Sequence, residues 1–237
     1  MSKAWKIVFL SLLSIVVISL LYLSTFKLKE VEVSGCEVVN EQDVLHAISN
    51  YTKSDNTVLI YLKNKIKPIE SLRFVAKMDI EIVSRNKLSV TVYEKSIAGC
   101  VEYMDQFIYF DKDGIILDAL DHRIDGIPRV EGLVFDQWEI GQKLPIEDKG
   151  KFQMILSVTQ LLDKYELDVD SIEFTAENEI VLTHEGIIIL LGEGEYLAIQ
   201  MMNLGSILEG LEGMEGTLYM KDFNSDNATA SFSRKKY

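Results

Sequence analysis

Cysteine is scarce in this sequence, and its scarcity limits how the fold can be held together. The 237 residues include only two cysteines, Cys36 and Cys100. Two cysteines are too few for a disulfide-rich scaffold, and their spacing matches no metal-binding motif. Two interpretations remain open: one disulfide between Cys36 and Cys100 in an exported domain, or two small hydrophobic residues packed separately. The second is favoured, because free cysteine commonly behaves as a buried hydrophobic residue.

Basic residues are also in short supply. The chain has 24 Lys and Arg against 37 Asp and Glu, which gives a formal net charge of −13. Proteins that bind the phosphates of nucleic acid need clustered Lys and Arg. We therefore expect no nucleic-acid partner. A chain of this length is expected to form one or two domains, and no spacer rich in proline and glycine separates them, since proline occurs only three times.

Motifs for catalysis, metals and cofactors are missing. The three histidines, His46, His122 and His184, lack the i, i+4 partner or nearby cysteine that a zinc site uses. No serine stands in a G-x-S-x-G elbow. The GEGE segment at 192–195 is not a dinucleotide-binding motif, and DKDG at 111–114 lacks the rest of a calcium loop. We therefore expect no catalytic residue, no metal and no cofactor.

Long apolar runs are absent, with one exception near the N-terminus. Residues Ile7–Phe26 are twenty consecutive uncharged positions, which as a helix would measure about 30 Å, the thickness of a bilayer's hydrocarbon core. The run predicts a transmembrane helix over residues 7–26 after a cytoplasmic tail, residues 1–6. A cleaved signal peptide is the alternative, but LSTFKL at the end of the run lacks a small-x-small cleavage site. The retained helix predicts a single-pass type II protein of the cell membrane, with an extracytoplasmic C-terminal domain.

Residues 27–96 have the pattern of a β-α-α-β-β domain. Period-two alternation predicts strands at 28–34, 74–83 and 88–93, and period-3.6 patterns predict helices at 41–49 and 58–67. Asn40 and Asp43 resemble a capping box at the start of the first helix, and Pro68 ends the second. The alternation places three residues of the last strand on one inner face: Leu88, Val90 and Val92.

Residues 97–224 read instead as a series of short strands interrupted by two helices. Strands are expected at 98–104, 106–111, 171–175, 179–184, 187–191 and 216–223, with helices at 149–167 and 196–209. This pattern predicts a larger, mostly antiparallel β domain with two helices. A polar C-terminal tail, residues 225–237, follows it. The expected class of the whole chain is α+β.

The order of these segments resembles that of the FtsQ/DivIB family of bacterial cell-division proteins. After the apolar run, VEVSG, EQDVLHAI, the helix ending at Pro68-Ile69 and LSVTVYEK together resemble the POTRA domain of that family. Further along, YFDKDGIIL, IPRVEGL, LLGEGEYLAIQMMNLGSIL and GTLYMKDF resemble its later segments. Two positions depart from the family pattern: Asn86-Lys87, where the hairpin turn often contains proline, and Gln200, near where lysine is common.

The resemblance implies a non-enzymatic scaffold of the division machinery at the septum. The family's members bind two small single-span coiled-coil proteins on the outer face of the membrane, of the FtsL and FtsB/DivIC types. Through these partners, and with the septal penicillin-binding protein as a further one, the chain would help control septal peptidoglycan synthesis. The alternative from another class is a membrane-anchored cell-wall hydrolase or sensor, which would need a pocket with converging polar residues.

A partner site is expected on the final predicted strand, Gly216–Phe223, and the tail up to Phe232. A terminal strand has a free edge, to which an extended peptide can add through backbone hydrogen bonds. The alternation leaves two aromatic anchors exposed and one lysine available to an acidic partner: Tyr219, Phe223 and Lys221. The alternative is that both aromatic side chains pack against the preceding helix. The resemblance favours the same site, because the closing strand of the family contacts the small coiled-coil partner.

Overall fold

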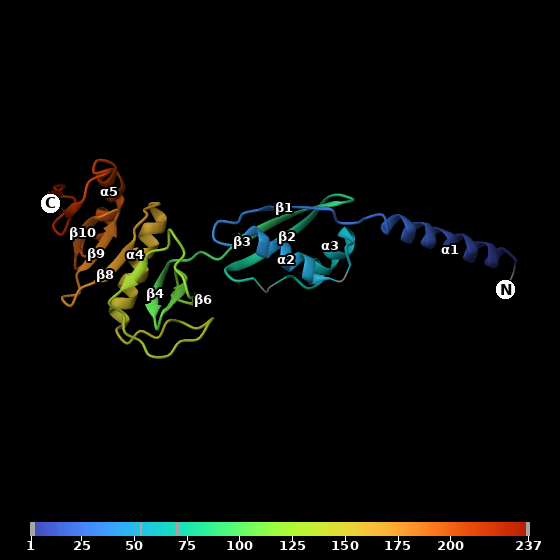
Figure 1. Cartoon of the computed structure of the whole chain (residues 1–237), viewed down its shortest axis with the longest axis horizontal. Coiled ribbons are helices and arrows are strands. Elements are labelled where there is room, and N and C mark those ends of the chain that lie inside the picture. The colour runs from blue at the N-terminus through green and yellow to red at the C-terminus, as the bar shows by residue number, and fades with distance from the viewer. Residues whose placement is uncertain (1–2, 53, 70–71, 236–237) are drawn as a thin grey trace. The chain divides into compact units, whose positions relative to one another are not determined.

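The computed structural model describes residues 3–52, 54–69 and 72–235. The chain forms two compact units, residues 1–95 and residues 96–237. Figure 1 labels the helices and strands of both units. Helices and sheets occur in each unit, so the predicted α+β class is confirmed.

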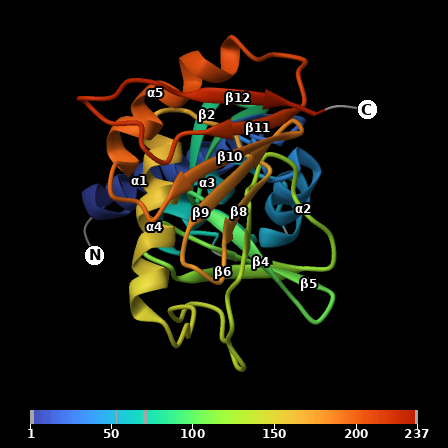
Figure 2. The same ribbon diagram turned by 90° about the vertical axis from the view of Figure 1, so that its left-hand side faces the viewer.

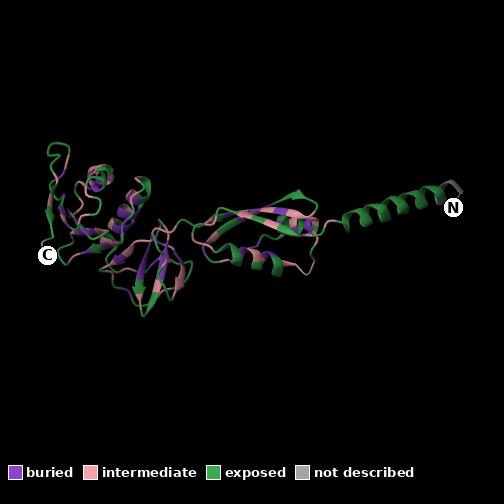
Figure 3. Ribbon diagram, turned by 45° about the horizontal axis from the view of Figure 1, so that its top comes forward, coloured by how far each residue is buried: buried purple, intermediate pink, exposed green. Residues whose placement is uncertain are grey.

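The first element of the first unit is α1, Lys3–Leu23. Its described side chains are exposed, as the green colour in Figure 3 shows. The helix stops short of the predicted limit at Phe26, whose amide closes a turn on the carbonyl of Leu23 at 3.1 Å. Within the part of the chain that the structure describes, no helix combines the length and the apolar character needed to cross a membrane. The transmembrane helix over residues 7–26 therefore stays a prediction, and residues 1–2 of the expected tail lie outside the described residues.

A three-stranded sheet and two helices make up the rest of the first unit. Its elements are β1 (Glu30–Ser34), α2 (Glu41–Tyr51), α3 (Thr57–Ile66), β2 (Val75–Ser84) and β3 (Lys87–Glu94). The sheet order is β1-β3-β2; β1 runs parallel to β3, and β2 runs antiparallel to it. The element order β-α-α-β-β is the one that the sequence predicted.

Side-chain caps fix where the two helices begin, and apolar faces fix how they pack. The side-chain oxygen of Asn40 accepts a hydrogen bond from the amide of Gln42, and that of Asn56 accepts from the amides of Val58 and Leu59. The predicted inner face of β3 is confirmed, because Leu88, Val90 and Val92 are all buried. They share one core with helix residues and residues of β2: Val44, Ile48, Ile60, Met78 and Ile80.

The carboxylate of Glu94 holds the end of β3 against the segment that leads into α2. Its Oε1 accepts hydrogen bonds from the amides of Glu37 and Val39 at 3.0 and 2.8 Å, and its Oε2 accepts one from the amide of Val38 at 3.0 Å. Hydrogen bonds to an ionised carboxylate are roughly twice as strong as neutral ones. Sequence periodicity could not identify this contact, because it joins residues 55 to 57 positions apart.

The second unit is built on one nine-stranded sheet. Its strands are β4 (Gly99–Tyr103), β5 (Gln106–Phe110), β6 (Ile116–Leu120), β7 (Arg129–Glu131), β8 (Ser171–Phe174), β9 (Ile180–His184), β10 (Ile187–Gly192), β11 (Gly216–Tyr219) and β12 (Ser231–Arg234). The order across the sheet is β12-β11-β10-β9-β8-β7-β4-β5-β6, and Figure 2 shows β8 to β12 side by side. Five of the eight neighbouring pairs are antiparallel and three are parallel, so the predicted excess of antiparallel pairing is small.

Two helices, α4 (Lys149–Lys164) and α5 (Leu197–Glu209), pack on one face of this sheet. Their buried side chains form a single core with alternate residues of the strands: Ile155, Leu156 and Leu162 of α4, Met201 and Leu204 of α5, and Ile172, Leu182, Ile189 and Leu218 of the sheet. Complete burial of each such side chain is worth about 1.5–3 kcal/mol. This core fixes which face of the sheet is covered and which is left to solvent.

The C-terminal strands differ from the sequence prediction. The strand expected over Gly216–Phe223 ends at Tyr219, and Ser231–Arg234, expected in the polar tail, forms β12. The sequence SFSR contains one large apolar residue, so its own pattern carries little strand signal. Its pairing with β11, which is not a local property of the sequence, makes it a strand. The last two residues of the expected tail, 236–237, lie outside the described residues.

The hydrogen bonds to the Glu94 carboxylate allow a direct test of what holds the first unit together. Replacing Glu94 by Gln keeps the shape but removes the charge and turns one acceptor into a donor, so we expect the first unit to lose about 1–3 kcal/mol of stability. Hydrogen exchange of the β3 amides, measured against urea concentration, reports this unit separately. Glu81→Gln, an exposed position on β2, is the matched control and should change little; an equal effect of both variants would contradict a specific role for Glu94.

Candidate functional site

The edge that was expected to be free is covered in the structure. β12 pairs antiparallel with β11, in the register Gly216–Arg234, Thr217–Ser233, Leu218–Phe232 and Tyr219–Ser231. The expectation of a free edge on the strand beginning at Gly216 was therefore wrong. Among the strands of the described chain, β12 is the outermost at this end of the sheet. The exposed edge lies one strand further on than predicted.

The hydrogen bonds of β11 show which backbone groups β12 leaves unpaired. The amides of Gly216 and Met220 donate to carbonyls of the β10 side, at 3.3 and 2.9 Å, whereas the carbonyl of Glu215 accepts from the amide of Lys235 at 2.9 Å. Even-numbered residues of β11 thus bond toward β10, and odd-numbered ones bond toward β12. By the alternation of an antiparallel ladder, Phe232 and Arg234 direct their N–H and C=O groups outward.

The close approach of β12 to β11 depends on Gly216. A Cβ at this position would stand 2.3 Å from the carbonyl oxygen of Ser233 and 2.8 Å from Cζ of Phe232. The absent side chain therefore leaves room for the ring of Phe232, which is half-buried and packs against the core opposite Leu218. Phe232 is the one apolar anchor of β12, since Ser231, Ser233 and Arg234 are exposed.

The residues predicted to contact a partner differ in how far they are exposed and paired. Tyr219 is 45% exposed, as expected, whereas Phe223 is only 5% exposed and lies in the core. The expectation for Phe223 was wrong because the chain leaves the sheet after Tyr219: a turn from the Phe223 amide to the Met220 carbonyl breaks the alternation. Lys221 is not held free for a partner, because its Nζ lies 2.5 Å from Oε1 of Glu179.

The face of the sheet opposite the helices carries apolar side chains next to this edge. Ile188 of β10 is 44% exposed and lies beside Thr217, and half-buried Leu190 lies beside Tyr219. Val181 of β9, also half-buried, extends the surface beyond Leu190. We call Val181, Ile188, Leu190 and Tyr219 the outer face. It lies next to the exposed edge of β12 and could contact side chains of an added strand.

Gln200 explains how the edge is attached to the rest of the unit. This side chain of α5 is completely buried, and its Nε2 donates to the carbonyls of Leu191 and Met220, at 3.0 and 2.7 Å. Leu191 lies at the end of β10, and Met220 directly follows the neighbouring strand β11. The sequence marked Gln200 only as a departure from the family pattern; its role depends on a fold that brings residues 191 and 220 together.

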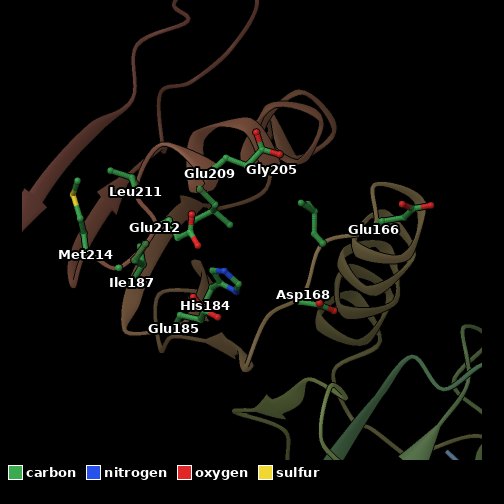
Figure 4. Close-up of a pocket in the computed structure, with 13 residues that line it drawn as sticks. Glu166, Asp168, His184, Glu185, Ile187, Gly205, Glu209, Leu211, Glu212 and Met214 are labelled. Carbon is green, nitrogen blue, oxygen red and sulfur yellow. The ribbon is translucent and has the colours of Figure 1, made fainter. Parts of the chain in front are cut away.

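A groove with an acidic rim lies elsewhere in the second unit. It has a volume of about 440 Å³ and lies among the ends of α4, β9 and α5 and the loop after α5. Figure 4 shows its lining, which includes five carboxylates, one histidine and several apolar side chains: Glu166, Asp168, Glu185, Glu209 and Glu212, His184, and Leu167, Ile187, Leu211 and Met214. All five carboxylate residues are exposed. The groove has no arrangement of a nucleophile, a base and an orienting group that would indicate catalysis.

The other two histidines are not among the residues that line this groove. His46 is part of α2, and His122 lies in the loop after β6, with its Nδ1 2.8 Å from Oδ1 of Asp121. Among the described residues, no three His, Cys, Asp or Glu side chains are placed to hold a metal ion.

Both cysteines carry free thiols in the structure. Cys100 on β4 is completely buried, and burial raises the pKa of its thiol from an ordinary 9.0 to about 11. Cys36 is half-buried against the core of the first unit; burial raises its pKa, and the negative charges of Glu94 and Glu41 add to the increase. The two cysteines lie in different units, so the disulfide that the sequence left open stays a prediction.

The first unit has the architecture of a POTRA domain, and comparison with known families identifies its type. Residues 26–95 match the family model described as "POTRA domain, FtsQ-type". The chain therefore contains an FtsQ-type POTRA domain, and this match supports the predicted resemblance to the FtsQ/DivIB family. A search of curated proteins gave no match.

Thiol labelling tests the environments of the two cysteines. In the native chain at neutral pH and without reductant, a maleimide should modify Cys36 but not Cys100, and urea should expose both. Mass spectrometry after labelling shows which thiols were modified, and a mass showing two fewer hydrogens with neither thiol labelled would reveal a disulfide.

The pKa of Cys100 also makes stability depend on pH. Because this pKa is higher in the folded chain, the contribution of the thiol to stability is complete below pH 9.0 and is lost as the pH rises toward 11.

Proposed function

We propose that this chain is a non-enzymatic scaffold of the bacterial division machinery. The FtsQ-type POTRA domain is the observation that carries the proposal. The scaffold binds small single-span coiled-coil proteins of the FtsL and FtsB/DivIC types outside the cytoplasm. Through them, and together with the septal penicillin-binding protein, it helps control septal peptidoglycan synthesis. Such a role requires surfaces that hold partners in place rather than a catalytic centre.

A membrane anchor over residues 7–26 is part of this proposal. The twenty uncharged positions of this run support it. The exposed side chains of α1 between Ile7 and Leu23 also support it, because they have no core of their own to pack into. The chain would then be a single-pass type II protein of the cell membrane at the septum, with all residues after 26 on the outer side.

The exposed edge of β12 is the proposed binding site for the FtsB/DivIC-type partner. An extended segment of the partner would add as a further strand, with its backbone paired to the outward N–H and C=O groups of Phe232 and Arg234. Backbone pairing supplies affinity with little dependence on sequence. The outer face, with Ile188 and Tyr219 at its most exposed positions, would supply side-chain contacts and therefore selectivity.

Proline at position 234 tests this edge with little disturbance to the fold. Arg234→Pro removes an N–H that points away from β11, and proline is tolerated on edge strands when that group faces solvent. The partner would lose a hydrogen bond and meet the proline ring, so its binding should weaken roughly tenfold to a hundredfold. Affinity of the full chain for an FtsB/DivIC-type protein, measured in detergent, gives the result.

Arg234→Ala is the matched control, because it removes the same charge and side chain but keeps the N–H group. It should bind within about threefold of the unchanged chain, since an exposed charge at the rim of an interface contributes little. Thermal unfolding of both variants should match, which excludes loss of β12. Equal affinity of the proline and alanine variants would place the partner away from this edge.

A further inference from the structure

One helix of the POTRA domain exposes an apolar stripe that the core does not use. Leu59, Leu62 and Ile66 of α3 have exposed fractions of 53%, 47% and 85%. Their spacing of three and four residues places them along one side of the helix. Exposed apolar residues scattered singly are ordinary on protein surfaces, but three on one side of a ten-residue helix form a continuous surface.

The opposite side of α3 already makes the contacts that hold the helix in place. Thr57, Ile60 and Asn64 are buried. The Asn64 Nδ2 donates to the carbonyl of Met78 on β2 at 3.5 Å, and its Oδ1 accepts from the amide of Ile69 at 3.2 Å. The buried side of α3 therefore holds the helix in the domain, and the stripe is not part of the core.

The charge around the stripe is the reverse of that of the chain. From Asn56 to Ile69 the sequence has three lysines and no acidic residue, whereas the whole chain has a net charge of −13. Lys63 donates to the carbonyl of Tyr51, and Lys65 lies 5.7 Å from the centre of the Tyr61 ring. Lysine side chains of this kind can lay their methylene groups on an apolar surface while the ammonium group reaches an anionic one.

α3 also begins where α1 ends. The amide of Thr57 donates to the carbonyl of Phe26 at 3.1 Å, and Nδ2 of its cap Asn56 donates to the carbonyl of Leu23 at 2.7 Å. Figure 1 shows α3 at the end of the POTRA domain from which α1 extends. A ten-residue helix is about 15 Å long, so the whole stripe lies within about that length of helix from the residues bonded to Phe26 and Leu23.

We propose that the stripe Leu59–Leu62–Ile66, with Lys65 and Lys67, docks onto anionic lipid headgroups at the membrane surface from which α1 emerges. The proposal rests on the membrane anchor of the proposed function. Apolar residues beside lysines are the usual composition of a helix that lies at a membrane interface. A second contact with the bilayer would restrict the directions that the POTRA domain can take relative to its anchor.

A lipid surface fits these observations better than a partner protein does. The lysines have no acidic neighbour within the segment, so an anionic surface of any shape satisfies them. The bonds to Leu23 and Phe26 place the stripe next to the bilayer whenever α1 spans it. A partner helix would have to reach the same place and displace lipid.

Fluorescence in nanodiscs tests the docking on the full chain. An environment-sensitive dye is attached at Leu62→Cys in a Cys36→Ser background, where Cys100 is protected by burial. In discs containing phosphatidylglycerol, the dye should be quenched by brominated lipid and should emit at shorter wavelength. The double variant Lys65→Glu, Lys67→Glu should reduce the docked-to-undocked ratio roughly tenfold or more, since each lysine near an anionic surface contributes about fivefold.

Glu81→Cys is the matched control position for the dye. Glu81 is an exposed residue of β2 whose side chain alternates with buried Ile80, so it projects from the face of the sheet opposite the helices. A dye there should stay accessible to a water-soluble quencher in every disc. Discs of phosphatidylcholine alone should show weaker quenching at position 62 than the anionic discs do.

Three outcomes would overturn the proposal, and they differ from one another. If the chain enters the discs but the dye at position 62 is as accessible as that at position 81, the anchor stands and the docking is wrong. If the chain does not enter the discs, the membrane anchor itself fails, and the docking fails with it. If the dye at position 62 becomes buried only when a coiled-coil partner is added, the stripe belongs to a protein interface.

Discussion

The parallel pairing of β10 with β11 is the constraint on which the C-terminal half of the second unit depends. Parallel neighbours need a crossover connection, and α5 provides it by packing Met201 and Leu204 into the core while Gln200 bonds the carbonyls of Leu191 and Met220. Once β11 is fixed with its even-numbered residues bonded toward β10, its odd-numbered residues can bond only on the other side. That arrangement creates the place for β12, and it decides that Phe232 and Arg234 direct their backbone groups outward.

Much of this fold could be predicted from local patterns, because burial follows periodicity wherever an element has one clear inner face. The alternation in Leu88, Val90 and Val92 and the positions of α2 and α3 are examples. The prediction failed where structure depends on distant contacts. β12 has almost no pattern of its own, and Phe223 turns inward because the chain bends after Tyr219. The free edge was consequently placed one strand too early, although Tyr219 is exposed as expected.

The two proposed contact surfaces differ in physical character, which would allow one scaffold to engage two kinds of neighbour. The β12 edge offers backbone groups on a strand that is mostly serine and arginine, so it suits an extended peptide and resists nonspecific hydrophobic association. The α3 stripe offers apolar and cationic groups, in a chain whose overall charge is strongly negative, so it suits an anionic lipid surface. Each surface lies on an element whose opposite side is fixed by buried contacts, and the contacts in turn hold the surface rigid.

Residue-resolved hydrogen exchange of the full chain, with and without an FtsB/DivIC-type partner, tests the central claim most directly. The amides of Phe232 and Arg234 point away from β11, so they should exchange rapidly in the free chain and become protected in the complex. The amides of Ser231 and Ser233, already bonded to β11, should change much less. Protection that appears elsewhere while Phe232 and Arg234 still exchange rapidly would show that the partner does not add to the β12 edge.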